Sequence, residues 1–97
     1  MKAVRLLADA RREFNDQVAY YERQRAGLGK RFRLAAEAVF MQAGETPAHG
    51  KRGVGGTRRM LVRGFPFAVV YLERPDLVLV YAIAHLARSP SYWQSRL

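Results

Sequence analysis

Apolar residues recur at helical spacing through the first half of the chain. A first stripe runs at positions i, i+4, i+8 and i+11 and consists of Ala10, Phe14, Val18 and Tyr21. Asp9 precedes this stripe and is the predicted N-cap of a helix. After a break at Gly27-Leu28-Gly29, a second stripe consists of Leu28, Phe32, Ala35, Val39 and Ala43 and ends at Gly44, with Pro47 beyond. The two stripes predict a helical hairpin.

The hydrophobic period changes from helical to two at Thr57. Residues 58–63 alternate and lead through Gly64 into the apolar segment 65–72, which predicts two antiparallel strands. Residues 77–84 are apolar without interruption, as expected for a strand that is covered on both faces and lies inside a sheet. A short strand is predicted at 3–7. Between hairpin and strands, residues 44–56 hold five of the eight glycines and predict the longest loop.

The element order β-α-α-β-β-β predicts an α+β fold. We expect the hairpin to cover one face of a mostly antiparallel four-stranded sheet, in a single domain spanning residues 1–97. The predicted core consists of Phe14, Val18, Phe32, Val39, Val69, Val80 and Ile83. The opposite sheet face stays open, framed by Arg58 or Arg59, Arg63, Tyr71 and the C-terminal tail. A basic and partly aromatic face of this kind is typical of a binding surface.

The composition adds a strong positive charge to this picture. The 97 residues include 17 basic and 8 acidic ones, which gives a formal net charge of +9. Residues 51–97 carry eight basic and only two acidic side chains, so the charge is concentrated in the second half. Fourteen of the basic residues are arginine, whose planar guanidinium group binds phosphate and carboxylate groups through two parallel hydrogen bonds. The partner is therefore expected to be nucleic acid, an acidic protein or an anionic lipid surface.

Several classes of site are excluded or disfavoured by the sequence. The absence of cysteine excludes disulfides, cysteine-ligated zinc and a cysteine nucleophile. His49 and His85 lack metal-binding spacing, so no metal is expected. The segment 44–51 departs from a phosphate-binding loop in its glycine spacing and in the residue after Lys51, so no nucleotide cofactor is expected. No signal peptide or membrane span is predicted, and a cytoplasmic location is the expectation.

The second half of the chain contains the candidate residues for proton transfer, phosphate binding and stacking on bases. His85 lies near Arg88, whose charge favours a neutral imidazole able to transfer a proton; alternatively, His85 caps the strand end through a backbone hydrogen bond. The arginines of the first predicted strand after Thr57, Arg58, Arg59 and Arg63, either hold a phosphate or form the solvated edge of that strand. The aromatic candidates for stacking on bases are Tyr71, Tyr92 and Trp93. For Trp93, a hydrophobic plug that closes the core is the favoured alternative.

A set of short motifs in a fixed order resembles the ParE/RelE superfamily, the small basic toxins of bacterial type II toxin–antitoxin modules. The motifs are Tyr20-Tyr21-Glu22, Gly27-Leu28-Gly29 with Phe32, Arg58-Arg59, the segment 64–71, Ala82-Ile83-Ala84-His85, Arg88 to Pro90, Tyr92-Trp93 and Arg96. The resemblance spans nearly the whole chain and implies a β-α-α-β-β-β fold. It also implies an acidic antitoxin as partner, held in a toxin–antitoxin hetero-oligomer.

The resemblance implies one of two activities. ParE-like members poison DNA gyrase without a hydrolytic site, whereas RelE-like members cut mRNA on the ribosome. RelE-like sites use sheet lysines, but this chain has no lysine after Lys51, and its ending resembles ParE-like sequences. We therefore expect gyrase as the target, with the ribosome and mRNA as the alternative. The expected target or antitoxin contacts are Arg58, Arg59, Arg63, Tyr71, Arg88 and Arg96; a ribonuclease would use His85, Arg88 and Tyr92.

Overall fold

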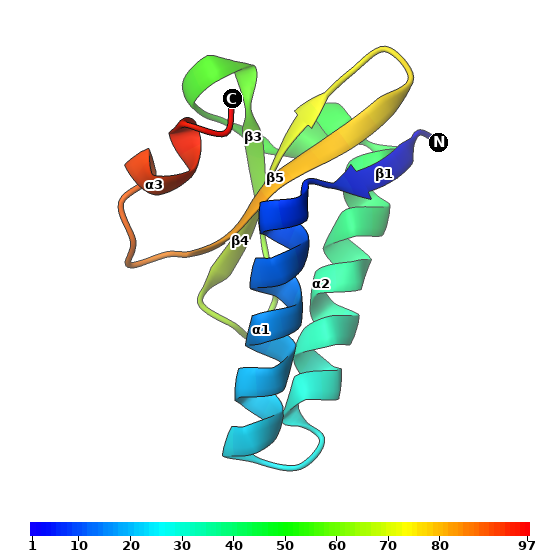
Figure 1. The fold of residues 1–97 in the computed structure, drawn as a ribbon. Helices are drawn as coiled ribbons and strands as arrows, with labels where there is room; N and C mark the ends of the chain where they lie inside the picture. Colours follow the sequence, from blue (N-terminus) through cyan, green and yellow to red (C-terminus); the bar gives the residue numbers. More distant parts are fainter.

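The computed structural model describes residues 1–97 and consists of a helical hairpin packed on a mixed sheet (Figure 1). The elements are β1 (Ala3–Leu6), α1 (Ala8–Gln24), α2 (Leu28–Glu45), β2 (Lys51–Arg52), β3 (Arg58–Leu61), β4 (Phe67–Glu73), β5 (Leu77–His85) and α3 (Ser91–Gln94). Two short 3₁₀ turns, Pro47–His49 and Val54–Gly56, flank β2. The predicted α+β class and the hairpin on one sheet face are confirmed.

The strands form one sheet in the order β1-β5-β4-β3-β2. β1 runs parallel to β5, with Ala3 opposite Leu77 and Leu6 opposite Val80, and all other neighbours are antiparallel. The interior position predicted for the apolar segment 77–84 is confirmed, because β5 lies between β1 and β4. α1 and α2 lie side by side, and their far ends project beyond the sheet (Figure 1).

Two apolar clusters fill the two faces of the sheet. The larger one, between the hairpin and the sheet, contains six of the seven predicted core residues, and Val18 packs against it. The smaller one lies on the opposite face and consists of Val70, Ala82, Ala84 and Trp93. The C-terminal segment therefore covers part of the face that the sequence predicted to be open, and burial of Trp93, 6% exposed, confirms the hydrophobic plug.

The sheet has five strands rather than the four predicted. The additional strand, β2, lies within the segment 44–56, where a long loop was expected, and pairs with β3 through Lys51 opposite Arg59. The Tyr71 hydroxyl holds this segment: it donates to the carbonyl of Pro47 at 2.7 Å and accepts from the Gly50 N–H at 3.0 Å. A two-residue strand shows no alternation of its own, so the hydrophobic pattern does not reveal it.

The helix ends differ from the sequence prediction at two residues. Asp9 is not an N-cap, because α1 begins at Ala8 without a side-chain cap; Asp9 instead accepts from Arg12 at 3.0 Å within the first turn. Gly44 does not end α2, which continues to Glu45. A Cβ at Gly44 would lie 2.7 Å from the carbonyl oxygen of Lys2. The glycine is therefore required by the close approach of α2 to the chain leading into β1.

The turn between the two helices is where the sequence placed it. Gly27 has a φ of +88°, which favours glycine, and Glu22 accepts hydrogen bonds from the Gly27 and Gly29 N–H groups at 2.8 and 3.0 Å. A Cβ at Gly29 would lie 2.5 Å from the Val18 carbonyl oxygen, so the helices meet closely here. Glu22 thereby satisfies N–H groups at the start of α2 that the helix itself leaves free.

Candidate functional site

A cleft of about 820 Å³ lies between α1 and the end of β5. We call it the C-terminal cleft. It brings together the three residues predicted for a ribonuclease site, His85, Arg88 and Tyr92. The α1 side of the cleft includes Glu13 and Tyr20. The topology thus gathers candidate residues from the end of β5 and from the tail around one hollow.

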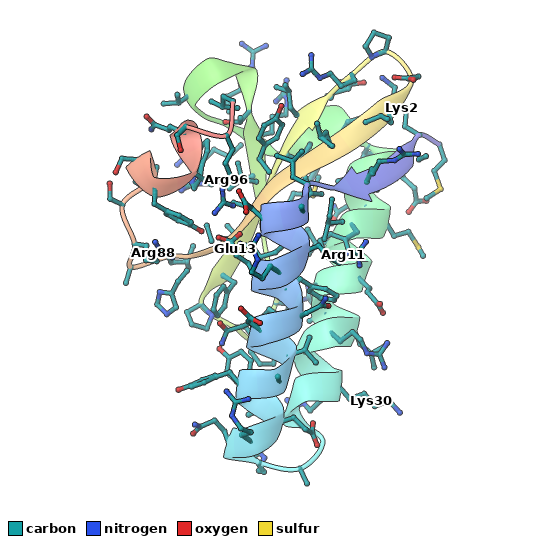
Figure 2. All side chains as sticks on the ribbon, in the orientation of Figure 1. Lys2, Arg11, Glu13, Lys30, Arg88 and Arg96 are labelled. Carbon is teal, nitrogen blue, oxygen red and sulfur yellow. The ribbon has the colours of Figure 1, made fainter.

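An ion pair between Glu13 and Arg96 fixes the tail on α1 (Figure 2). The two Arg96 Nη atoms donate to the two Glu13 carboxylate oxygens at 3.0 and 2.8 Å, and Nη1 also donates to the Tyr81 carbonyl at 2.9 Å. Glu13 accepts in addition from the Ile83 N–H at 3.1 Å. β1 pairs with β5 only as far as Val80, so this pair supplies hydrogen bonds along a stretch of β5 that β1 does not reach.

Sequence reasoning missed Glu13 and the fixed role of Arg96. Glu13 was not singled out from the sequence, yet its side chain is only 22% exposed and that of Arg96 15%. The Asp9 carboxylate lies 3.6 Å from Arg96 Nε and adds to the cluster. Arg96 was expected to contact a target or antitoxin; in the structure it is ion-paired with Glu13, and a contact with a partner stays a prediction. The hydrogen bonding of Arg96 to the Glu13 carboxylate is the main cause that raises the pKa of Arg96.

Tyr92 lies under two guanidinium groups at the tail side of the cleft. The Arg88 Cζ lies 3.6 Å from the centre of the Tyr92 ring and the Arg96 Cζ 5.3 Å from it. Burial is the main cause that raises the pKa of Tyr92 to about 12, and Glu13 raises it further against the opposing charges of Arg88 and Arg96. At neutral pH the phenol is therefore protonated, so that it can donate a hydrogen bond but cannot act as a base.

This pKa predicts a loss of stability in alkali. The pKa of Tyr92 in the folded chain, about 12, lies above the ordinary value of 10.0, so the unfolded chain releases the proton first. The contribution of the protonated Tyr92 to the free energy of unfolding is fully present below pH 10.0 and is lost as the pH rises toward 12. We expect Tyr92→Phe to flatten this decline in urea unfolding measured across the range. Tyr20→Phe, which removes a phenol from an exposed residue, is the control, and an equal flattening would contradict the assignment.

His85 takes the strand-end role that the sequence offered as one of two alternatives. Its Nδ1 accepts from the Ala87 N–H at 3.0 Å, and its ring packs edge-on against Phe67 at 5.1 Å between ring centres. The Arg88 N–H donates to the His85 carbonyl at 3.1 Å and tightens the same turn. The backbone cap is confirmed, and a part in proton transfer stays a prediction.

The basic strand residues do not converge on one site. Register places Arg59 opposite Val70 on the open face, whereas Arg58 lies opposite Tyr71 on the helix face and donates to the Gly50 carbonyl at 3.0 Å. Arg63 is exposed beyond the far end of β3. The prediction that Tyr71 frames the open face is wrong: it is 0% exposed and belongs to the main core. Successive side chains of a strand point to opposite faces of the sheet, and the prediction assigned Tyr71 to the wrong one of the two faces.

Most of the positive charge has no partner within the chain. Thirteen of the seventeen basic side chains have no carboxylate within 4.0 Å. The structure brings together no group of three histidine, aspartate or glutamate side chains that could hold a metal ion. None of its helices combines the length and the apolar character needed to cross a bilayer. The unpaired cations thus stand out as groups available to an anionic partner.

Comparison with known proteins shows a shared fold. No family model matches the sequence, and no curated protein matches it. Among solved structures, the chain is similar to one from the chromosomal ParDE TA system from P. aeruginosa, with a TM-score of 0.77 and 11% identity. The match covers 89% of this chain and 97% of that chain. The fold implied by the resemblance to the ParE/RelE superfamily is therefore confirmed, with β2 as an additional short strand.

Proposed function

We propose that this chain is the toxin of a type II toxin–antitoxin module and is neutralised by a cognate antitoxin. The observation that carries the proposal is the fold shared with a chain of a ParDE TA system, which extends over 97% of that chain. The charge supports it, because thirteen unpaired cations suit an acidic antitoxin segment that folds as it binds. Toxin and antitoxin then form a hetero-oligomer.

We further propose that the toxin acts by binding DNA gyrase. The candidate proton-transfer groups are engaged in structural contacts: Tyr92 is protonated and stacked under Arg88, and His85 caps the end of β5. No lysine follows Lys51, in contrast to the lysine-based sites that RelE-like members use. Inhibition through protein binding needs cationic contact residues but no general base, and this chain has the former in excess.

Ribosome-dependent cleavage of mRNA is the second candidate function. The C-terminal cleft favours it, since His85, Arg88 and Tyr92 line one hollow. In such a reaction the RNA 2′-hydroxyl loses its proton, its oxygen attacks the adjacent phosphorus, and the bond from phosphorus to the 5′-oxygen of the next nucleotide breaks. Arg88 stabilises the developing phosphorane charge, His85 accepts the proton of the 2′-hydroxyl, and Tyr92 donates a proton to the leaving 5′-oxygen.

A supercoiling reaction and a translating extract, run side by side with the purified chain, test the proposal. We expect inhibition of DNA gyrase and intact mRNA, and relief of inhibition when the product of the adjacent gene is added first. Calorimetry of that pair is expected to give tight binding with a large negative heat-capacity change, because folding on binding buries apolar surface. Cleavage of mRNA in programmed ribosomes with supercoiling untouched would promote the second candidate. Absence of binding at micromolar concentration would remove the toxin assignment.

A further inference from the structure

A second cleft, of about 220 Å³, lies on the sheet face opposite the hairpin, between the β2–β3 edge and the C-terminal segment. We call it the tail cleft. Its apolar lining comes from Val54, Val70, Pro90 and Trp93. Four basic residues lie around it, Lys51, Arg52, Arg58 and Arg59, of which Lys51 and Arg59 have their side chains on this face of the sheet. The hollow therefore combines apolar surface with two cations, and the C-terminal cleft shares none of these eight residues.

The walls of the tail cleft are held by the fold. Lys51 lies directly opposite Arg59 in the β2–β3 pair, so both side chains lie on the same face of the sheet as Val70. The adjoining loop is closed by the Gly53 N–H, which donates to the Thr57 carbonyl at 2.8 Å. The Thr57 hydroxyl in turn donates to the Val54 carbonyl at 2.6 Å. A hollow with fixed walls requires little ordering when it binds.

The cations of the tail cleft have no counter-charge in the chain. None of the four has a carboxylate within 4.0 Å, and Arg58 alone donates a side-chain hydrogen bond, to the Gly50 carbonyl. Like charges gathered around one hollow repel each other, and an anion relieves that repulsion. Since Lys51 and Arg59 lie on this face and are exposed, they can reach anionic groups placed at the mouth.

The aromatic residues distinguish a peptide from single-stranded nucleic acid as the occupant. Nucleic acid that binds along a basic groove stacks its bases on exposed aromatic faces. Trp93 is only 6% exposed, Arg88 covers the Tyr92 ring, and Tyr71 is buried on the other face of the sheet. No aromatic face is thus offered to a base, whereas aliphatic and proline surface suits an apolar side chain. At 220 Å³ the hollow is too small for a helix, which is about 10 Å across.

We propose that the tail cleft receives an apolar side chain from an extended, acidic segment of a partner protein. Carboxylates that flank this side chain pair with Lys51 and Arg59 at the mouth. The inference rests on the proposed function, in which the antitoxin is that partner, and it adds where the acidic segment binds and what it carries there.

Trp93 makes the inference testable, since it is the only tryptophan and lines the tail cleft. The probe is the purified product of the adjacent gene in a form free of tryptophan. Tryptophan emission then comes from Trp93 alone and is followed as the probe is added. We expect Trp93 emission to shift on binding, and Lys51→Gln/Arg59→Gln to weaken the affinity about tenfold. The matched control is Lys30→Gln/Arg31→Gln, which removes the same charge at the hairpin end, where Lys30 points away from the sheet (Figure 2). We expect the control to bind nearly as the unchanged chain does.

The outcomes separate the inference from the function on which it rests. Equal weakening by the two double variants, or saturated binding without a change in Trp93 emission, overturns the tail cleft while the toxin assignment stands. A single-stranded oligonucleotide that shifts Trp93 emission, and loses this effect in Lys51→Gln/Arg59→Gln, makes the cleft a nucleic-acid site and overturns the inference. No binding of the adjacent gene product removes both proposals.

Discussion

Replacing Glu13 with alanine is expected to lower the free energy of unfolding by about 3 kcal/mol, the low end of the range for one partner lost from a buried ion pair. The low end applies because the side chains of Glu13 and Arg96 keep 22% and 15% exposure. The variant leaves Arg96 with only the more distant Asp9 carboxylate, and it removes the acceptor of the Ile83 N–H. Urea unfolding measures the difference.

Glu37→Ala is the matched control for this prediction. Glu37 accepts from Arg33 at 3.3 Å on the surface of α2, where both side chains are more than 40% exposed. Loss of such an i,i+4 pair is expected to cost about 0.3–0.5 kcal/mol. A double-mutant cycle with Arg96→Met then isolates the coupling, because Arg96→Met is expected to cost little once Glu13 is absent. Equal effects of Glu13→Ala and Glu37→Ala would show that the Glu13 pair does not hold the tail.

The fold was predictable because its signals are local. The stripe of α1 places Phe14 inward, and that of α2 places Phe32 inward, and the two rings lie 6.3 Å apart in the core. The period change at Thr57 marks the return to strand structure, and the apolar run 77–84 identifies an interior strand. Each signal needs only neighbouring residues, so one sequence is enough to read it.

The features that were missed depend on contacts between distant residues. Glu13 and Arg96 are 83 positions apart, and nothing in the pattern around Glu13 distinguishes it from solvated neighbours. The face of Tyr71 depends on the strand register, which a one-residue shift reverses, and its hydroxyl bonds to a segment 24 positions away. The tail cleft likewise joins Lys51 to Trp93 through the fold of the C-terminal segment. Long-range pairing of this kind has no sequence period.

The strongest discrimination between the two candidate functions is expected from His85→Gln. The glutamine carbonyl can accept the Ala87 N–H as the His85 Nδ1 does at 3.0 Å, so the turn after β5 is expected to persist. If the chain inhibits DNA gyrase, growth arrest and inhibition of supercoiling stay largely intact in this variant. If it cuts mRNA with His85 as the proton-transfer group, cleavage falls roughly a hundredfold to ten-thousandfold.

Arg88→Gln completes this test because the two functions predict different pairs of results. Arg88 stacks on Tyr92 at the cleft, so removal of its charge weakens binding to the target in a gyrase inhibitor while His85→Gln leaves that binding intact. In a ribonuclease that uses His85, both variants lose cleavage, since one removes the proton transfer and the other the stabilised phosphorane. Growth arrest, supercoiling and mRNA integrity are measured for both variants. Loss of growth arrest in Arg88→Gln with retention in His85→Gln supports target binding, and joint loss with intact supercoiling assigns the cleft to RNA cleavage.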